Sequence, residues 1–192
     1  MSSKNHELHS NLSLRKIDLA TDVDDFMLWA SDDLVSRYVS WYPCKTKEQT
    51  IELINNKILN NSYFKLICLN NKAIGYVIVT YNTGNETCCR AEIGYVLARE
   101  YWGKGIARWA VDTLVSIIFE ERSEVGRVEA YVVADNVRSQ KFLEKVGFVK
   151  EGVLRKFYIL KGKAQDMAVF SLLRVDKFDG VGTEILEEGD KI

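Results

Sequence analysis

Glycine, aromatic and basic residues are concentrated in one short stretch of the chain, residues 101–107, shortly after an apolar run that ends at Leu97. Glycine lets a backbone adopt positive φ and approach a ligand closely. The apolar periodicity that starts at Ile106 predicts a helix, whose first N–H groups lack internal partners and lie at the positive end of its dipole. A helix start of this kind, with the cation of Lys104 beside it, is suited to bind a phosphate or pyrophosphate.

Three further polar residues are candidates for chemistry. Glu92 lies in the predicted strand before residues 101–107, which we call the glycine-rich turn. Asn136 and Ser139 begin a later helix. A carboxylate whose pKa is raised by burial can accept a proton, and a hydroxyl can donate to a leaving group. Both histidines, His6 and His9, lie in the polar N-terminal segment, so a histidine-based nucleophilic mechanism is not expected.

The composition is that of an ordinary soluble domain. The chain has 192 residues, 47% of them hydrophobic and 28% charged, with a net charge of -1. This near-neutral balance gives no reason to expect nucleic acid or an anionic membrane as partner. No apolar run approaches the roughly 20 residues that a membrane span needs. The four cysteines have no zinc-like spacing, so we expect no metal, reduced thiols and a cytoplasmic location.

Hydrophobic periodicity and turn residues predict the elements that position these residues. An N-terminal tail (1–11) and an acidic C-terminal tail (177–192) are expected to flank one domain (12–176). Asn70 and Asn71 suit a tight hairpin turn, Gly147 suits a helix end, and Thr46 or Thr50 could cap a helix. The expected strands are 12–17, 63–69, 73–81, 88–97, 128–134, 152–160 and 166–175. The expected helices are 21–29, 32–39, 51–59, one from 106 that fades over 120–122 and ends before Gly126, and 136–146.

This order predicts a single-domain α/β (α+β) fold. Strands joined by short turns should pair antiparallel, whereas strands separated by a helix should pair parallel. We therefore expect one mixed, mostly antiparallel sheet flanked by helices.

Four local patterns resemble the GNAT superfamily of acyl-CoA-dependent N-acetyltransferases, and within it the Rim-type (ribosomal-protein N-acetyltransferase) branch. In chain order they are residues 91–97, residues 101–107, Asn136 to Ser139 together with 144–148, and residues 151–155. The resemblance spans residues 12–175 and implies a splayed parallel strand pair in the sheet. In the loop fingerprint of the family, Trp102 stands where glutamine or arginine is usual, a replacement typical of the Rim-type branch.

The resemblance implies that acetyl-CoA is the co-substrate. Main-chain N–H groups of the glycine-rich loop would hold its pyrophosphate, and the pantetheine arm would pair with the preceding strand. Asn136 is also a suitable N-cap for its helix, and both roles stay open at this point. The cofactor-binding residues implied are Tyr95, Val96, Leu97, Gly103, Lys104, Gly105, Ile106, Ala107, Arg108, Asn136 and Ser139.

The resemblance also implies direct attack of a neutral amine on the thioester. Glu92 would act as the base, with a salt-bridged or solvent-facing strand residue as its alternative role. Many family members carry a tyrosine acid where this chain has Leu143, so Ser139 is the expected replacement, directly or through water. The N–H of Val96 is the expected donor to the thioester oxygen.

The acceptor is less well defined by the sequence. Branch resemblance favours a primary amine of a protein or peptide, with a polyamine or antibiotic amine as alternatives. A non-catalytic acyl-CoA-binding module is a further alternative, because the tyrosine acid is missing. The aromatic residues Trp29, Trp41 and Tyr42 fit either an acceptor wall or core packing. We expect a monomer or homodimer.

Overall fold

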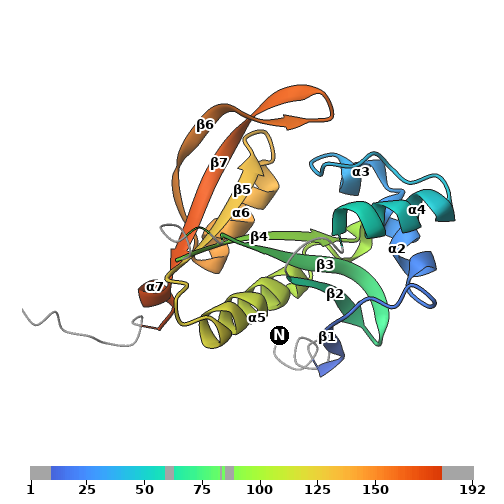
Figure 1. Ribbon diagram of the computed structural model, residues 1–192, viewed down its shortest axis with the longest axis horizontal. Helices are drawn as coiled ribbons and strands as arrows, with labels where there is room; N and C mark the ends of the chain where they lie inside the picture. The colour runs from blue at the N-terminus through green and yellow to red at the C-terminus, as the bar shows by residue number, and fades with distance from the viewer. Residues whose placement is uncertain (1–9, 59–62, 83, 85–88, 179–192) are drawn as a thin grey trace, which may run out of the picture.

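The computed structural model of the chain describes residues 10–58, 63–82, 84 and 89–178 (Figure 1). The helices are α2 (Val23–Ala30), α3 (Asp33–Ser36), α4 (Lys47–Leu53) with a π-helical turn (Ile54–Ile58), a 3-10 turn (Arg99–Tyr101), α5 (Ile106–Glu121), α6 (Val137–Val146) and α7 (Arg174–Phe178). The strands are β1 (Leu12–Arg15), β2 (Tyr63–Leu69), β3 (Lys72–Tyr81), β4 (Arg90–Leu97), β5 (Arg127–Val133), β6 (Val149–Leu160) and β7 (Lys163–Leu173).

The strands form one seven-stranded sheet in the order β1-β2-β3-β4-β5-β7-β6. All neighbours pair antiparallel except β4 and β5, which are parallel. This parallel pairing covers only three residue pairs, from Arg90 with Arg127 to Glu92 with Glu129. Beyond them the two strands diverge (Figure 1). The predicted fold class, with its splayed parallel strand pair, is confirmed.

Side chains alternate between two cores on opposite faces of the sheet. Along β4, Ala91, Ile93 and Leu97 pack into the cluster that contains the apolar stripe of α5 and Leu143 of α6. Val96 instead belongs to the cluster formed with α2 and α4. Because successive strand residues point to opposite faces, neighbouring residues of β4 serve different sides of the molecule.

Local sequence signals explain several element ends. Asn70 and Asn71 have φ of 50° and 66° and form the β2–β3 turn. Gly147 ends α6 with a φ of 105°, and the Thr46 hydroxyl accepts the N–H of Gln49 at the start of α4. The caps predicted at Thr46 and Gly147 are thus present.

The C-terminal hairpin and its end differ from the prediction. β6 begins at Val149 and β7 at Lys163, so the hairpin is longer than expected. Its register shifts twice along β6, which interrupts the alternation that sequence periodicity detects. The chain then turns into α7, where the Asp176 carboxylate accepts the N–H of Leu173. α7 ends at Phe178, two residues past the predicted domain end at 176, and the rest of the expected tail lies outside the described residues.

Other predicted segments are shorter in the structure or fall partly outside it. α3 has four residues, fewer than the predicted 32–39, and β4 starts at Arg90. The predicted strand start at Cys88 and the helix end at Leu59 lie outside the described residues. No helix in the described ranges has the length and apolar character that crossing a membrane requires.

Candidate active site

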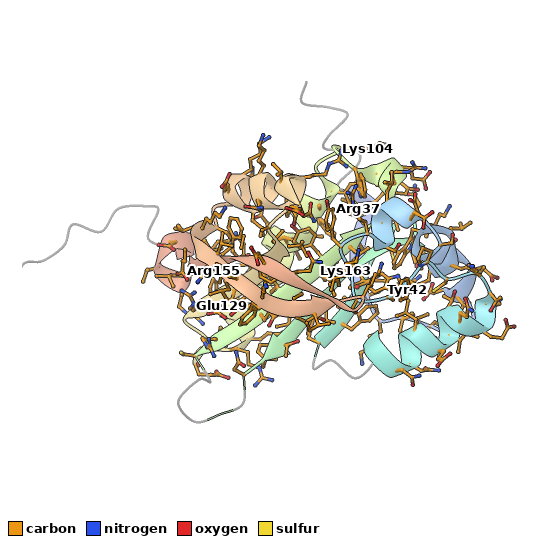
Figure 2. All side chains as sticks on the ribbon, turned by 90° about the horizontal axis from the view of Figure 1, so that it is seen from above. Arg37, Tyr42, Lys104, Glu129, Arg155 and Lys163 are labelled. Atoms are coloured by element: carbon orange, nitrogen blue, oxygen red, sulfur yellow. The ribbon has the colours of Figure 1, made fainter. Side chains whose placement is uncertain are left out.

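A cleft of about 1520 Å³ opens where β4 and β5 diverge. Its walls come from the glycine-rich turn, the start of α6, the segment after α3 and the β6–β7 hairpin. Viewed from above, Lys104 beside the glycine-rich turn lies well apart from Glu129 of β5 (Figure 2). The cleft thus connects the predicted anion site with a second, acidic region.

The glycine-rich turn has the geometry of an anion site. Gly103 and Gly105 have φ of 75° and 81°, and a Cβ on either would meet no atom within 4 Å. Positive φ therefore requires glycine here, and the space in front of both residues is open. The α5 hydrogen bonds start with the N–H of Trp109 donating to the Gly105 carbonyl, so the N–H groups of residues 106–108 are left for a ligand. No acidic residue occupies the first turn of α5.

Trp102 and three basic residues lie within or next to this turn. The Trp102 indole N–H donates to the Leu97 carbonyl at 2.7 Å and ties the turn to the end of β4. The Arg138 guanidinium lies 4.5 Å from the Trp102 ring centroid, and Lys104 lies over Tyr101. Exposed Arg108 pairs with Asp112 at 3.5 Å. Trp102, which replaces the usual glutamine or arginine, therefore has a structural role. Its ring also holds the Arg138 guanidinium beside the anion site.

Hydrogen bonds fix which main-chain groups of β4 face the cleft. The main-chain N–H and carbonyl groups of even-numbered β4 residues point toward β3, as three observations indicate. The Arg90 carbonyl accepts the N–H of Asn82, and the Ala98 N–H donates to the Ile74 carbonyl. A Cβ on Gly75 would lie 2.2 Å from the Val96 oxygen, so that carbonyl points toward β3 as well. The main-chain groups of odd-numbered β4 residues therefore point toward β5 or, where β5 has diverged, into the open cleft.

This alternation corrects one expectation. The N–H of Val96 points toward β3 and not into the cleft, so it is not the donor to a thioester oxygen. The N–H and carbonyl of Tyr95 and the N–H of Leu97 point to the open side instead, whereas the Leu97 carbonyl already accepts the Trp102 indole N–H. A one-residue difference along a strand reverses the direction of the N–H, which sequence periodicity for side chains does not report.

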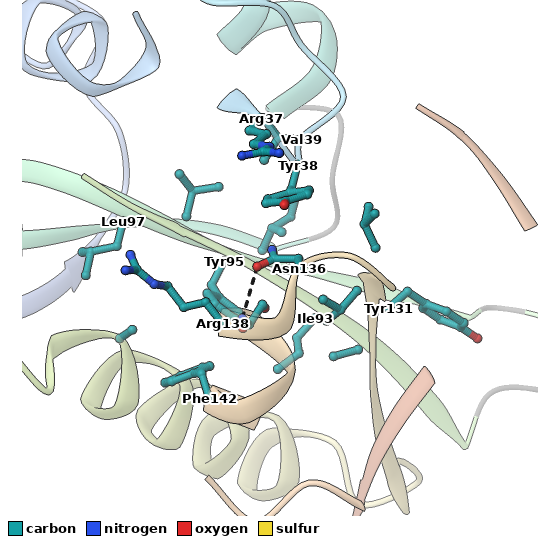
Figure 3. Close-up of a pocket in the computed structure, with 18 of the residues that line it drawn as sticks. Arg37, Tyr38, Val39, Ile93, Tyr95, Leu97, Tyr131, Asn136, Arg138 and Phe142 are labelled. Carbon is teal, nitrogen blue, oxygen red and sulfur yellow. Dashed lines mark hydrogen bonds between the residues drawn. The ribbon is translucent and has the colours of Figure 1, made fainter. Parts of the chain in front are cut away.

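Figure 3 shows Tyr95 of β4 close to Asn136 at the start of α6. Ser139, in the first turn of α6, lines the same cleft. The Asn136 side chain accepts the N–H of Ser139 at 3.2 Å, so its capping role is present. The Tyr95 hydroxyl lies 2.5 Å from the Ser139 hydroxyl, and its ring packs against Phe142 with centroids 5.0 Å apart. Leu143 is fully buried in the core, so the position of the tyrosine acid does not face the cleft.

The opposite face of the sheet carries two carboxylates. Glu92 and Glu129 are the last residues paired before β4 and β5 diverge, and both line the cleft. Glu129 is 4% exposed and bonds Arg127 at 2.6 Å, with Arg90 at 3.5 Å and the Tyr131 hydroxyl at 3.2 Å. Glu129 is not among the residues expected from the sequence, although it is a lone carboxylate between the apolar residues Val128 and Ala130 of a buried strand.

Glu92 has a different environment from Glu129. Glu92 is solvent-exposed in the cleft, as the solvent-facing alternative expects. Within the described residues no hydrogen bond or ion pair of its carboxylate is found, so the salt-bridged alternative is not what the structure shows. Partial loss of solvent within the cleft, and then repulsion from Glu129, raise the pKa of Glu92 above its ordinary value. A carboxylate with a raised pKa is suited to accept a proton near neutral pH.

Removing the charge of Glu129 is expected to change the pH dependence of a reaction in which Glu92 accepts a proton. In Glu129→Gln the pKa of Glu92 falls, because one of the two causes that raise it is gone. A group that must be deprotonated then stays active to lower pH, so the acid limb of the kcat/KM profile moves to lower pH. Glu151→Gln is the matched control, since Glu151 bonds the same Arg127 but does not act on Glu92. An acid limb that moves equally in both variants would contradict this interpretation.

The two groups of polar residues occupy opposite faces of the sheet. Tyr95 and Ser139 lie on the α5–α6 face, whereas Glu92 and Glu129 lie on the face of α3 and the β6–β7 hairpin. The opening between β4 and β5 joins the two faces. A ligand held by the glycine-rich turn can therefore meet a second ligand that approaches from the side of the carboxylates.

The aromatic residues that the sequence associated with the acceptor have mixed positions. Trp29 and Trp41 are buried and belong to the core of α2 and α4, although Trp41 also lines the cleft. Tyr42 is 68% exposed and lies under the Lys161 ammonium. Tyr131 stacks on Phe157 of the hairpin, with centroids 5.6 Å apart, and both line the cleft. In the described part of the chain, no three metal-ligating side chains gather.

Comparison with protein families identifies this arrangement. The model of the acetyltransferase (GNAT) domain matches residues 11–149. The chain belongs to the GNAT family. It is an acyl-CoA-dependent N-acetyltransferase, and the expected co-substrate class is confirmed.

Individual relatives agree with this GNAT assignment. The chain is 35% identical over 169 residues to the uncharacterized N-acetyltransferase p20 of Bacillus licheniformis, an alignment that covers 85% of this chain and 93% of that protein. A putative ribosomal N-acetyltransferase of Bacillus subtilis, YdaF, is 38% identical over 85 residues, or 44% of this chain and 46% of that protein. The structure of the Vibrio cholerae spermidine N-acetyltransferase in complex with CoA and spermine shares the fold, with a TM-score of 0.69, 24% identity, and coverage of 88% and 98%.

Proposed function

We propose that this GNAT enzyme transfers an acetyl group from acetyl-CoA to a primary amine of a protein or peptide, by direct attack in a ternary complex. The observation that carries the proposal is the opening between β4 and β5. It joins a helix start with open main-chain N–H groups on one side to the carboxylate of Glu92 on the other, for which the described residues provide no partner.

The cofactor half of the site uses main-chain groups and nearby cations. The pyrophosphate would bind the N–H groups of Ile106, Ala107 and Arg108, with Gly103 and Gly105 providing close approach and Lys104 adding charge. The pantetheine arm would pair with the cleft-facing main chain of Tyr95 and Leu97 as an added strand. Val96 would connect these two residues but would not itself donate its N–H to the cofactor, since that N–H faces β3.

The chemical half requires three groups around the thioester. Glu92, directly or through water, would remove the ammonium proton so that a neutral amine attacks. A cleft-facing N–H of β4, from Tyr95 or Leu97, is the donor available to the thioester oxygen as charge develops on it. Ser139 would donate a hydrogen bond to the departing sulfur. CoA is a good leaving group near neutral pH, because a thiol has a pKa of about 8.5.

The acceptor belongs on the face of the carboxylates. A peptide amine is supported by the similarity to YdaF and by the stacked aromatic wall of Tyr131 and Phe157, which suits an apolar residue next to the reacting amine. A polyamine is the second candidate, because the carboxylate of Glu92 in the cleft attracts a cation and because a spermidine N-acetyltransferase is 24% identical over 139 residues.

An acceptor panel tests the proposed function. Purified enzyme with acetyl-CoA is incubated with peptides bearing free N-termini, with lysine-containing peptides and with spermidine, and thiol release and mass gain are measured. We expect release only with an acceptor present, and an added acetyl group on a peptide amine. Preference for spermidine would establish the second candidate. Binding of acetyl-CoA without turnover on any amine would instead favour the binding-module alternative.

A further inference from the structure

The hydroxyl pair of Tyr95 and Ser139 has a geometry that the proposed function does not yet explain. The two oxygens are 2.5 Å apart and link β4 to the first turn of α6, on the cofactor face of the opening. The tyrosine acid position of the family is occupied by Leu143, which is fully buried. Tyr95 therefore brings a phenol to the cleft from a strand and not from the helix.

Packing holds both partners in place. The Tyr95 ring packs against Phe142, and the Ser139 main chain is held by the Asn136 side chain. Only the two hydroxyl rotors are then free to choose a direction. A phenol is more acidic than an alcohol, so the Tyr95 hydroxyl is the better donor and the Ser139 oxygen the better acceptor. With that direction, the Ser139 hydrogen is left to point away from Tyr95.

Full proton transfer from this pair to the sulfur is unfavourable. Burial raises the pKa of Tyr95 to about 12. A CoA-like thiol has a pKa of about 8.5, so transfer from the phenol to the thiolate is uphill by orders of magnitude. The pair is therefore suited to stabilise a thiolate by hydrogen bonding, and solvent can protonate the thiolate afterwards.

We propose that Tyr95 is a positioning residue, whose hydroxyl donates to Ser139 and thereby aims the Ser139 O–H at the departing sulfur of CoA. This inference rests on the proposed function, because it places the sulfur at the opening beside Ser139. It assigns Tyr95 a side-chain role in addition to its main-chain contact with the cofactor. Hydrogen bonds to charged groups are stronger than neutral ones, and donors in series reinforce each other.

Binding of CoA and desulfo-CoA as a function of pH tests the pair without an acceptor. Desulfo-CoA lacks the thiol, so the ratio of the two affinities isolates the contribution of the sulfur. A donor that stabilises the thiolate lowers the pKa of the bound thiol. In the wild type, the affinity for CoA relative to desulfo-CoA should therefore rise about tenfold as pH increases through the thiol range. Calorimetry measures both dissociation constants.

The variants separate the possible outcomes. Ser139→Ala should abolish the rise, Tyr95→Phe should reduce it to about threefold or less, and the double variant should match Ser139→Ala. Tyr81→Phe is the control, since it removes a phenol hydroxyl from β3 on the same face but outside the cleft. Once an acceptor is known, Tyr95→Phe should lower kcat about tenfold and leave the KM for acetyl-CoA within twofold.

The results distinguish this inference from the proposed function. If Ser139→Ala abolishes the rise but Tyr95→Phe behaves as Tyr81→Phe, the inference is overturned and Ser139 keeps its role. If CoA and desulfo-CoA show the same pH dependence in the wild type, the donor role of the pair is overturned as a whole. Neither result depends on acetyl transfer, which the acceptor panel tests separately.

Discussion

Gly105→Glu is expected to weaken acetyl-CoA binding by at least about 100-fold, measured by calorimetry. Gly105 has a φ of 81° and faces open space at the start of α5. A side chain there costs roughly 1–2 kcal/mol of backbone strain. More importantly, its carboxylate would lie at the N–H groups meant for the pyrophosphate. An anion at a helix start is itself favourable, so the variant should fold while occupying its own anion site.

Gly162→Glu is the matched control for this experiment. Gly162 has a φ of 77°, is exposed, and likewise has no atom within 4 Å of a built Cβ. It lies in the β6–β7 turn, away from the glycine-rich turn. The two variants therefore share the strain and the added charge but differ in location. Similar acetyl-CoA affinity in both would show that the pyrophosphate does not bind at the start of α5.

The sequence predicted the order of elements because local signals mark them. The asparagine pair at the β2–β3 turn, Gly147 after α6 and the apolar stripe of α5 each act over a few residues. The positive φ of Gly103 and Gly105 was anticipated for the same reason. Such features depend on backbone sterics and helix ends, which are properties of neighbouring residues.

The features that the sequence did not provide depend on contacts between distant segments. Glu129 faces Glu92 because of the parallel register of β4 and β5, which no local pattern encodes. The contact of Tyr95 with Ser139 spans 44 positions. The direction of the Val96 N–H follows from which neighbour β4 pairs with at that point, so it required the sheet itself.

Glu92→Gln is expected to lower kcat about 10²- to 10³-fold with an ordinary alkyl amine, while acetyl-CoA affinity stays within about threefold. Loss of a positioned general base costs this much in many enzymes. Glutamine keeps the shape of the side chain, and Glu92 has no partner among the described residues that the substitution would orphan. Glu124→Gln, at an exposed ion pair with Arg122, controls for the loss of one surface charge.

The pH profile and the basicity of the acceptor amine show whether Glu92 removes the ammonium proton. A base acts when deprotonated, so wild-type kcat/KM should fall as pH decreases through the raised pKa of Glu92, and Glu92→Gln should lose that limb. An acceptor amine with a low pKa is already neutral and needs no base. Its rate should therefore depend much less on Glu92 than the rate of an alkyl amine does. If both amines lose the same factor, Glu92 positions the acceptor and does not remove its proton. The carboxylate of Glu129, held by Arg127, would not replace it, because it is already committed to that ion pair.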